Sequence, residues 1–256
     1  MKEKLTIIKV GGKIVEDKDS LAALLVQFAN IKGHKLLVHG GGRTATDIAA
    51  RLGVETTMVN GRRITDAAML DVVTMVYAGL VNKNVVASLQ AAGINALGLS
   101  GADMNVMRSD KRPVKDVDYG FVGDVKEVDA DRLAQLINSG ITPVMAPLTH
   151  DGKGSMLNTN ADTIAGETAK ACAKYFETTL VYCFEFPGVL SNPEDVNSVI
   201  PVITPTSFEK LKEEGVITGG MIPKIENALA AVNAGVAKVV ITKADALQSG
   251  GTTIQA

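Results

Sequence analysis

The sequence predicts an α/β protein with three layers, in which a mainly parallel, open β-sheet carries helices on both faces and is extended by β-hairpin excursions. Two observations lead to this prediction. Short apolar strands alternate with segments of helical periodicity along most of the chain, and parallel strands need such helical crossovers. The strands are also of the buried type, which is typical of a sheet covered on both faces. The 256 residues suffice for one large domain or two smaller ones.

The first elements establish the alternation. Residues 5–10 (LTIIKV) form an apolar strand, and two glycines follow it directly. Residues 18–31 place leucines and a phenylalanine on one face of a helix. Residues 36–39 predict the next strand, and 43–52 the next helix. A strand–helix–strand–helix order of this kind favours parallel pairing.

The middle of the chain adds excursions to this pattern. An Asn-Gly pair within 56–65 lies between two β-prone runs, which is the strongest short hairpin signal. A long helix is expected over 66–91 and a strand over 95–100. Residues 104–128 predict a strand-rich excursion rather than another helix.

The second half returns to simple alternation. We expect a helix over 129–138, a strand over 141–146, a glycine-rich crossing, a helix over 160–174 and a strand over 179–184. Further elements are expected at 206–214 and 223–234 (helices), at 238–242 (strand) and near 252–255 (a terminal strand). Two lobes, 1–178 and 179–256, are predicted, with the boundary in the loop before the strand at 179.

Composition excludes several classes of function. A formal net charge of −2 argues against generic binding to nucleic acid or to anionic membranes. No apolar run reaches the roughly 18 residues of a membrane span, and the N-terminus lacks a signal-peptide layout, so we expect a cytoplasmic protein. Cys172 and Cys183 lack CxxC spacing, and His34, His39 and His150 lack metal-ligand spacing. We therefore expect no metal site.

Four polar or glycine-rich segments are expected at one edge of the sheet. Ligands of open parallel sheets collect at the carboxyl ends of the strands. That rule brings together KVGGK (9–13), HGGG (39–42), SGAD (100–103) and the loop before NTNAD (158–162). Two of these are glycine-rich turns from strand to helix, whose exposed N–H groups favour an anion.

Lys9 and the HGGG turn each allow two interpretations. Lys9 is the penultimate residue of an apolar strand, where it is either a snorkelling end-of-strand lysine or a fixed cation aimed at phosphate. The glycines are either a tight turn or a cradle for an anion or substrate. They match neither GxGxxG nor a Walker A loop. We interpret His39 as a structural residue at the end of its strand.

Three further segments carry candidate side chains. Arg62 and Arg63 should point to opposite faces of a hairpin strand, so at most one faces a site, and both could simply be solvated. An arginine suits a carboxylate because its planar fork binds both oxygens. Asp162 either caps the helix that follows or holds lysines in place. Pro223 is expected at a helix start, and Lys224 beside it is a cation misplaced for the helix dipole, which indicates an anion.

Taken together, these segments resemble the amino acid kinase family, and the resemblance spans nearly the whole chain with consistent spacing. The matching segments are KVGGK, HGGGR, NGRRIT, Asn82-Lys83, GLSGAD, YGFVGDV (119–125), GSMLNTNAD, PGVL (187–190), GVITGGMIPKIENAL (215–229) and GGTTI (250–254). The resemblance implies the fold of that family, with the acceptor and the dimer contact in lobe 1–178 and the nucleotide in lobe 179–256.

The resemblance also implies an activity: transfer of the γ-phosphoryl group of ATP to the side-chain carboxylate of an N-acyl-L-glutamate, a step of arginine biosynthesis. Lys9 and Lys224 would flank the transferred group, and Asp162 would hold both lysines. Mg²⁺ would enter on the nucleotide. The other implied residues are Arg63, Asn158, Gly41 and Gly42 for the acceptor, Gly11 and Gly12 for phosphate, and Glu185, Pro187, Gly188, Leu190, Ile217 and Thr218 for the nucleotide.

The chain departs from the family pattern at several places. Phe184-Glu185-Phe186 stands where the family has a small hydroxyl residue and Asp-Val, 241–250 is short, and Ala102 replaces a common lysine. Inhibited relatives carry an extra N-terminal helix before the first strand, so we expect an uninhibited homodimer. Two alternatives stay open: another activity of the family (on carbamate, aspartate, glutamate, UMP or a carrier-bound aminoadipate), and a non-catalytic sensor of an acylated amino acid.

Overall fold

The computed structural model describes residues 2–219, 221–247 and 250–256. Its main sheet has eight strands in the order β12-β14-β13-β11-β1-β2-β8-β5. The six strands from β13 to β5 are parallel, whereas β14 is antiparallel to β13 and parallel to β12. The predicted mainly parallel sheet is confirmed. The strands are β1 (Lys4–Val10), β2 (His34–His39), β5 (Ala96–Leu99), β8 (Thr142–Met145), β11 (Glu177–Phe184), β12 (Val202–Ile203), β13 (Lys238–Lys243) and β14 (Thr252–Ile254).

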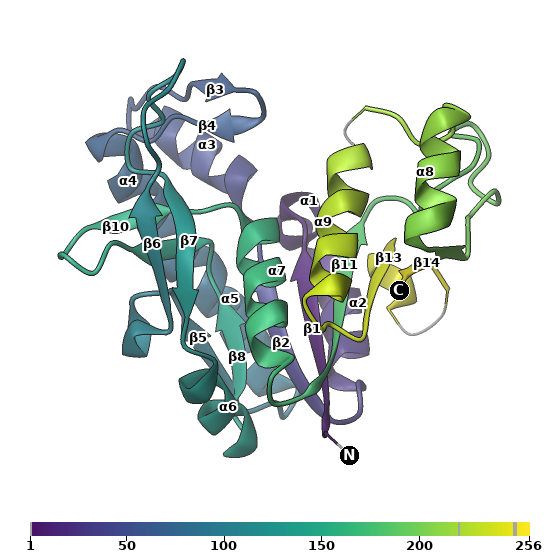
Figure 1. Cartoon of the computed structure of the whole chain (residues 1–256). Helices are drawn as coiled ribbons and strands as arrows, with labels where there is room; N and C mark the ends of the chain where they lie inside the picture. The colour runs from purple at the N-terminus through teal and green to yellow at the C-terminus, as the bar shows by residue number, and fades with distance from the viewer. Residues whose placement is uncertain (1, 220, 248–249) are drawn as a thin grey trace.

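Helices cover both faces of this sheet, as predicted (Figure 1). On one face α6, α7 and α9 pack against the strands, with α8 against α9. On the other face α2 and α5 cover the sheet, and α1 packs against α2 and α3. Separate buried apolar clusters lie on the two faces. The helices are α1 (Gly12–Glu16), α2 (Lys18–Ala29), α3 (Gly42–Arg51), α4 (Ala67–Val73), α5 (Asn82–Ala91), α6 (Ala130–Asn138), α7 (Ala161–Cys172), α8 (Pro205–Glu213) and α9 (Met221–Asn233).

The predicted excursions are both present. β3 (Met58–Val59) and β4 (Arg62–Arg63) form a hairpin whose turn residues, Asn60 and Gly61, have φ of 49° and 73°. Positive φ at both positions is the type I′ geometry that Asn-Gly favours. β6 (Met107–Lys111) and β7 (Gly123–Val128) lie in a second sheet of order β10-β9-β6-β7. The glycine-rich crossing proves to be a hairpin of β9 (Leu148–His150) and β10 (Met156–Asn158), too short for periodicity to reveal.

The long helix predicted over 66–91 is continuous but not uniform, because a π-helical segment, η1 (Thr74–Val81), separates α4 from α5. The whole run Ala67–Ala91 is 25 residues long, and by length and composition only it is apolar enough to cross a membrane. It packs inside the fold, with α3 and β10 against α4 and with β5 and β8 against α5. Its apolar composition therefore reflects packing inside the fold. An apolar run of this length was not predicted from the sequence.

Several boundaries differ from the prediction. α1 is only five residues long, and β12 only two, so neither left a periodic signal. α9 begins at Met221, two residues before the expected start at Pro223. Proline is tolerated anywhere in the first turn, where the backbone N–H has no intrahelical partner. Gly220 lies outside the described residues. The two predicted lobes share the main sheet, since β1 of the first pairs with β11 of the second.

Candidate active site

Two glycine turns meet at the carboxyl ends of β1 and β2. The β1 turn leads through Gly11 into α1, and the β2 turn leads through Gly40 and Gly41 into α3. A Cβ on Gly40 would lie 3.0 Å from the backbone nitrogen of Gly12. Gly40 is therefore glycine because the other turn packs against it, and the two turns are held together backbone to backbone.

The packed turns present a cluster of backbone amides. The nitrogens of Gly41 and Gly42 both lie 3.7 Å from the point where a Cβ on Gly12 would stand. Within the described residues, no acceptor is found for the N–H groups of Gly12, Gly41 and Gly42. Both Gly12 and Gly42 are the first residues of helices, where the dipole also favours negative charge. The cluster is suited to bind an anion.

His39 supports this turn and takes no direct part in it. It is fully buried, its Nδ1 lies 2.7 Å from the Gly40 carbonyl oxygen, and Nδ2 of Asn82 lies 3.1 Å from its Nε2. Asn82 also donates to the Val144 carbonyl at 2.9 Å. Burial lowers the pKa of His39 to about 4, so the ring is neutral, with Nδ1 donating and Nε2 accepting. The structural role predicted for His39 is confirmed.

Acid should destabilise the protein through His39. The pKa of His39 is lower in the folded state, at about 4, than the value of about 6.5 expected when unfolded. Stability is therefore intact above about pH 6.5 and falls, by up to about 3 kcal/mol, as the pH drops towards 4. Urea unfolding at pH 7.5 and pH 5 measures this loss. A His39→Gln variant, whose side chain cannot titrate, should lose clearly less between these pH values; an equal loss would assign the effect to other groups.

A cavity of about 240 Å³ opens beside the amide cluster. Arg63, only 8% exposed, lies in its wall and donates to the Gly42 carbonyl at 2.7 Å, to Thr46 Oγ1 at 2.9 Å and to Thr56 Oγ1 at 3.2 Å. Arg62 lines the same cavity although it is exposed. The expectation that at most one of the two arginines faces a site is therefore wrong. Arg62 follows the turn residue Gly61, where its long side chain reaches the cavity despite the alternation of β4.

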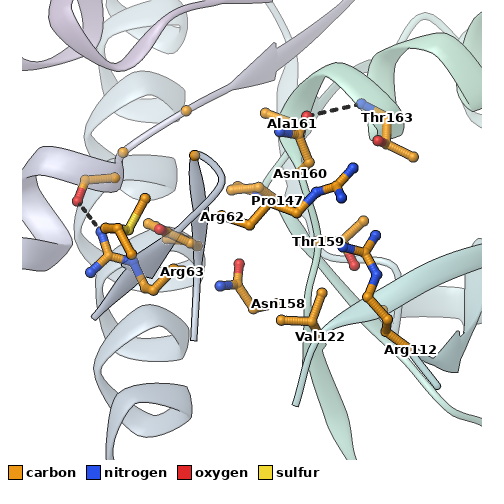
Figure 2. A pocket seen from close by; sticks show the side chains of 17 residues that line it. Arg62, Arg63, Arg112, Val122, Pro147, Asn158, Thr159, Asn160, Ala161 and Thr163 are labelled. Carbon is orange, nitrogen blue, oxygen red and sulfur yellow. Dashed lines mark hydrogen bonds between the residues drawn. The ribbon is translucent and has the colours of Figure 1, made fainter. Parts of the chain in front are cut away.

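The cavity is cationic and contains no acid among its described lining residues. Figure 2 shows Arg63 and Arg112 at opposite sides of it, with Asn158 between them in this view. Asn158 donates through Nδ2 to Thr65 Oγ1 at 2.9 Å, and its amide oxygen takes no part in this hydrogen bond. Arg112 is paired with Asp124, and both side chains come from the β6–β7 excursion. Such a wall suits a ligand with carboxylate groups and no ammonium group.

Asp162, which stands between the lining residues Ala161 and Thr163, forms an ion pair with Lys9. Nζ of Lys9 lies 2.7 Å from Asp162 Oδ1, and the side chain of Lys9 is only 10% exposed. The helix cap is Asn160, whose Oδ1 accepts from the backbone N–H of Asp162 at 2.7 Å and of Thr163 at 3.2 Å. The interpretation of Asp162 as the cap is therefore wrong, because Asn160 does that work and leaves the carboxylate for Lys9.

Lys224 lies on the other side of a second cavity of about 620 Å³, which Asp162 and Lys224 line together. This cavity shares Gly61, Arg62, Asn160 and Thr163 with the first, so the two are continuous. Nζ of Lys224 stands over the ring of Phe184, 4.1 Å from its centroid. Nζ of Lys9 lies 5.4 Å from the centroid of the same ring, so Lys224 and Lys9, 215 residues apart in the sequence, meet at one site. The second cavity is lined by both charges, with Asp162 and Glu167 beside Lys170 and Lys224.

Four of the six predicted nucleotide residues lie together. Gly188, Leu190, Ile217 and Thr218 line a mostly apolar cavity of about 170 Å³ between the β11 loop and α9. Glu185 instead pairs with Lys13 of α1, and Pro187 is not among the residues that line this cavity. Gly188 is required sterically, because a Cβ there would lie 2.8 Å from Thr252 Oγ1. Gly11, predicted for phosphate, precedes the amide cluster without belonging to it.

The comparisons with known proteins agree with this arrangement. The model of the amino acid kinase family matches residues 4–243. Acetylglutamate kinases of Phocaeicola vulgatus and Bacteroides thetaiotaomicron are 69% and 68% identical to the chain, with 99% and 100% of both sequences covered. The acetylglutamate kinase of Methanopyrus kandleri is 42% identical, with 98% of this chain and 99% of that sequence covered.

Solved structures share the fold. A crystal structure from Streptococcus mutans has a TM-score of 0.80 at 30% identity, with 98% of both chains covered. Carbamate kinase of Giardia has a TM-score of 0.72 at 13% identity, again with 98% of both chains covered; at that identity the likeness concerns the fold alone. The chain belongs to the amino acid kinase family, as its sequence segments indicated, and it is a kinase.

Proposed function

We propose that this enzyme transfers the γ-phosphoryl group of ATP to the side-chain carboxylate of N-acetyl-L-glutamate, a step of arginine biosynthesis. The observation that carries the proposal is the cavity in which Arg63, Asn158 and the Gly41–Gly42 turn come together with no acid among the described residues that line it. An acylated amine needs no carboxylate partner, whereas a free amino acid does. Relatives named acetylglutamate kinase, at 66–69% identity over 98–100% of the chain, support the same acceptor.

The acceptor's two carboxylates have different partners in this proposal. Arg63 attracts the α-carboxylate through the positive charge of its guanidinium group, and Asn158 binds the acylated amide. The side-chain carboxylate then points to the amide cluster of Gly12, Gly41 and Gly42. With a pKa near ~4.3 it is already ionised at neutral pH, so no general base is needed. The difficulty of the reaction is electrostatic, since this anion must approach an anionic nucleotide.

The positive charges of the two lysines lower this electrostatic repulsion. Lys9 and Lys224 flank the group in transfer and stabilise negative charge on its equatorial oxygens and on the leaving β-phosphate. The ion pair with Asp162 fixes Lys9 at the cavity edge and positions it; extension of that hold to Lys224 is part of the proposal. The backbone amides of Gly12, Gly41 and Gly42, which belong to the same lobe as Lys9, complete the cradle across from Lys224 in this proposal.

The nucleotide lies over the second lobe in this proposal. Its base and ribose lie near Gly188, Leu190, Ile217 and Thr218, with Glu185, Pro187 and Gly11 at the margin. Mg²⁺ would enter with ATP as part of the substrate and would neutralise charge on its phosphates. Among the described residues there is no group of three or more His, Cys, Asp or Glu side chains that could hold a metal ion.

A cytoplasmic homodimer completes the proposal. Met75 and Leu80, on the η1 segment of the first lobe, are 55% and 48% exposed, and apolar side chains of this size suit a contact between copies.

The alternative of a non-catalytic sensor is disfavoured by the pair of lysines at the cavity, for which a mere binder has no use. The alternative of a free amino acid as acceptor is disfavoured because none of the described residues that line the first cavity is an acid that could pair with an ammonium group.

The test is an assay with hydroxylamine, which traps an acyl phosphate as a hydroxamate. Purified protein with ATP, Mg²⁺ and N-acetyl-L-glutamate should form hydroxamate, and free L-glutamate, L-aspartate and carbamate should give none above background. N-succinyl-L-glutamate in parallel shows how the acyl end is selected. Formation of hydroxamate from free glutamate alone, or from no acceptor at all, would contradict the proposal.

Gly41→Ala should weaken the acceptor side selectively. Gly41 has φ of 154° and a Cβ there would lie 3.1 Å from the Tyr77 ring, so the turn and its amide must shift. We expect KM for N-acetyl-L-glutamate to rise and kcat to fall, each roughly 10-fold, the loss expected for a displaced hydrogen-bond donor. The dissociation constant of ATP, measured by calorimetry, should stay within about twofold. An equal loss of ATP affinity would place the turn at the nucleotide instead.

A further inference from the structure

Phe184, the last residue of β11, brings an aromatic ring to the two lysines. Lys9 of β1 is paired in register with Tyr182, and Phe184 is two residues further along the same strand, so all three side chains share one face of the sheet. Nζ of Lys9 lies 5.4 Å from the centroid of the Phe184 ring, and Nζ of Lys224 lies 4.1 Å from it. One ring thus contacts both ammonium groups.

The ring itself is held from its own side. Phe184 stacks on Tyr182, with centroids 6.0 Å apart and an interplanar angle of 19°. It also packs against the buried cluster under α7 and α9. Tyr182 is 7% exposed and its hydroxyl donates to the backbone carbonyl of Asp162 at 3.3 Å. The ring is therefore fixed relative to the same helix turn that supplies Asp162.

The two lysines differ in what else holds them. Lys9 has Asp162 as an ion-pair partner. Over residues 2–219, 221–247 and 250–256, no ion pair or side-chain hydrogen bond of Lys224 is found, and its contact is the Phe184 ring. The face of an aromatic ring attracts an ammonium group through the ring quadrupole. Unlike a carboxylate, it does so without accepting a conventional hydrogen bond, so the N–H donors remain available to phosphoryl oxygens.

We propose that Phe184 is a positioning residue for phosphoryl transfer: its ring face holds Lys224, and assists Asp162 in holding Lys9, so that both ammonium groups stand at the site before the anions bind. This inference rests on the proposed function and assigns a purpose to one of the residues at which the chain departs from its family. In the absence of the ring, Lys224 would have to be ordered by the phosphate itself, and part of the binding energy would be lost to that ordering.

The test uses the full-length enzyme with 4-fluoro-, 3,5-difluoro- and 3,4,5-trifluorophenylalanine at position 184. Fluorine lowers the negative potential of the ring face stepwise and changes its shape little. We expect log kcat to fall in proportion to the number of fluorines, by about 5- to 10-fold in total, which is the size of a partly desolvated cation–π contact. KM for N-acetyl-L-glutamate should stay within about twofold. Phe184→Tyr, which keeps the ring face, should retain near wild-type kcat.

Phe208 of α8 provides a matched control. Its ring is 2% exposed and also lies under a lysine, with Lys212 Nζ 5.2 Å from the centroid. The same fluorinated residues at position 208 should leave kcat unchanged. If kcat is insensitive to fluorination at 184 while Phe184→Leu lowers it, the ring only fills space and the proposal is overturned.

The affinity for ATP, measured by calorimetry without acceptor, separates this proposal from the proposed function. If the enzyme phosphorylates no N-acylglutamate, the proposed function is refuted. The affinity for ATP then still tests the role of Phe184. A stepwise loss of ATP affinity along the fluorinated series would then uphold the role of Phe184. A constant affinity would overturn it.

Discussion

Replacement of Lys9 by methionine is expected to lower kcat by about 100- to 1,000-fold, the cost of removing one preorganised donor from developing negative charge. Methionine keeps most of the length and apolar bulk of a side chain that is 10% exposed, so the loss should be electrostatic rather than structural. KM for N-acetyl-L-glutamate should change little, because Lys9 is reserved for the group in transfer. Steady-state kinetics, followed with a coupled assay that detects the ADP released, measures both constants.

Asp162→Asn is the companion variant. If Asp162 acts through Lys9, its replacement should lower kcat less than Lys9→Met does, by about 10-fold, and the double variant should be no worse than Lys9→Met alone. Independent, multiplying losses would mean that Asp162 contacts the reacting groups itself. Thermal unfolding of all three variants checks that the lost ion pair has not unfolded the site.

Replacement of Arg63 by methionine is expected to raise KM for N-acetyl-L-glutamate by about 100-fold, with KM for ATP nearly unchanged, because the buried cation that attracts a carboxylate is lost. Arg63 also bonds the Gly42 carbonyl and Thr46, so part of the effect will come from a looser turn. Arg63→Lys keeps the charge without the fork and should recover only part of the affinity.

Arg62→Met is the matched control on the same hairpin. Arg62 is exposed where Arg63 is 8% exposed, and a solvated cation contributes little to binding. We expect less than about a fivefold rise in KM for this variant. If Arg62→Met were as damaging as Arg63→Met, the acceptor would lie across the rim of the cavity rather than against β4.

The sequence sufficed for the fold because its signals were strong and local. Apolar strands such as 5–10 alternate with helical patterns, and the Asn-Gly pair at 60–61 by itself predicts a hairpin turn. The missed features are those with little local signal. The β9–β10 hairpin is made of three-residue strands, and the π-helical segment within 66–91 depends on packing rather than composition.

Arg63, Asn158, Gly41 and Gly42 of the candidate site were predicted from the family resemblance, whereas two lysines stood out from the residues alone. Lys9 in an apolar strand and Lys224 at a helix start were visible in this way. Only Asp162 was considered as the cap of α7, whereas the structure gives that position to Asn160, a side chain that suits it equally well. The roles of Gly40 and Phe184 could not be predicted from the sequence. They depend on contacts with Gly12 and Lys224, which lie in other segments of the chain.

The most direct test of the account is ³¹P NMR of the purified enzyme with Mg²⁺, ATP and N-acetyl-L-glutamate. Transfer to the side-chain carboxylate predicts loss of the γ-phosphate resonance and appearance of ADP together with one acyl-phosphate resonance, which hydroxylamine then removes. Lys9→Met should leave the ATP spectrum unchanged over the same time. Conversion of ATP to ADP and inorganic phosphate alone, or no consumption of ATP with any N-acylglutamate, would contradict the account.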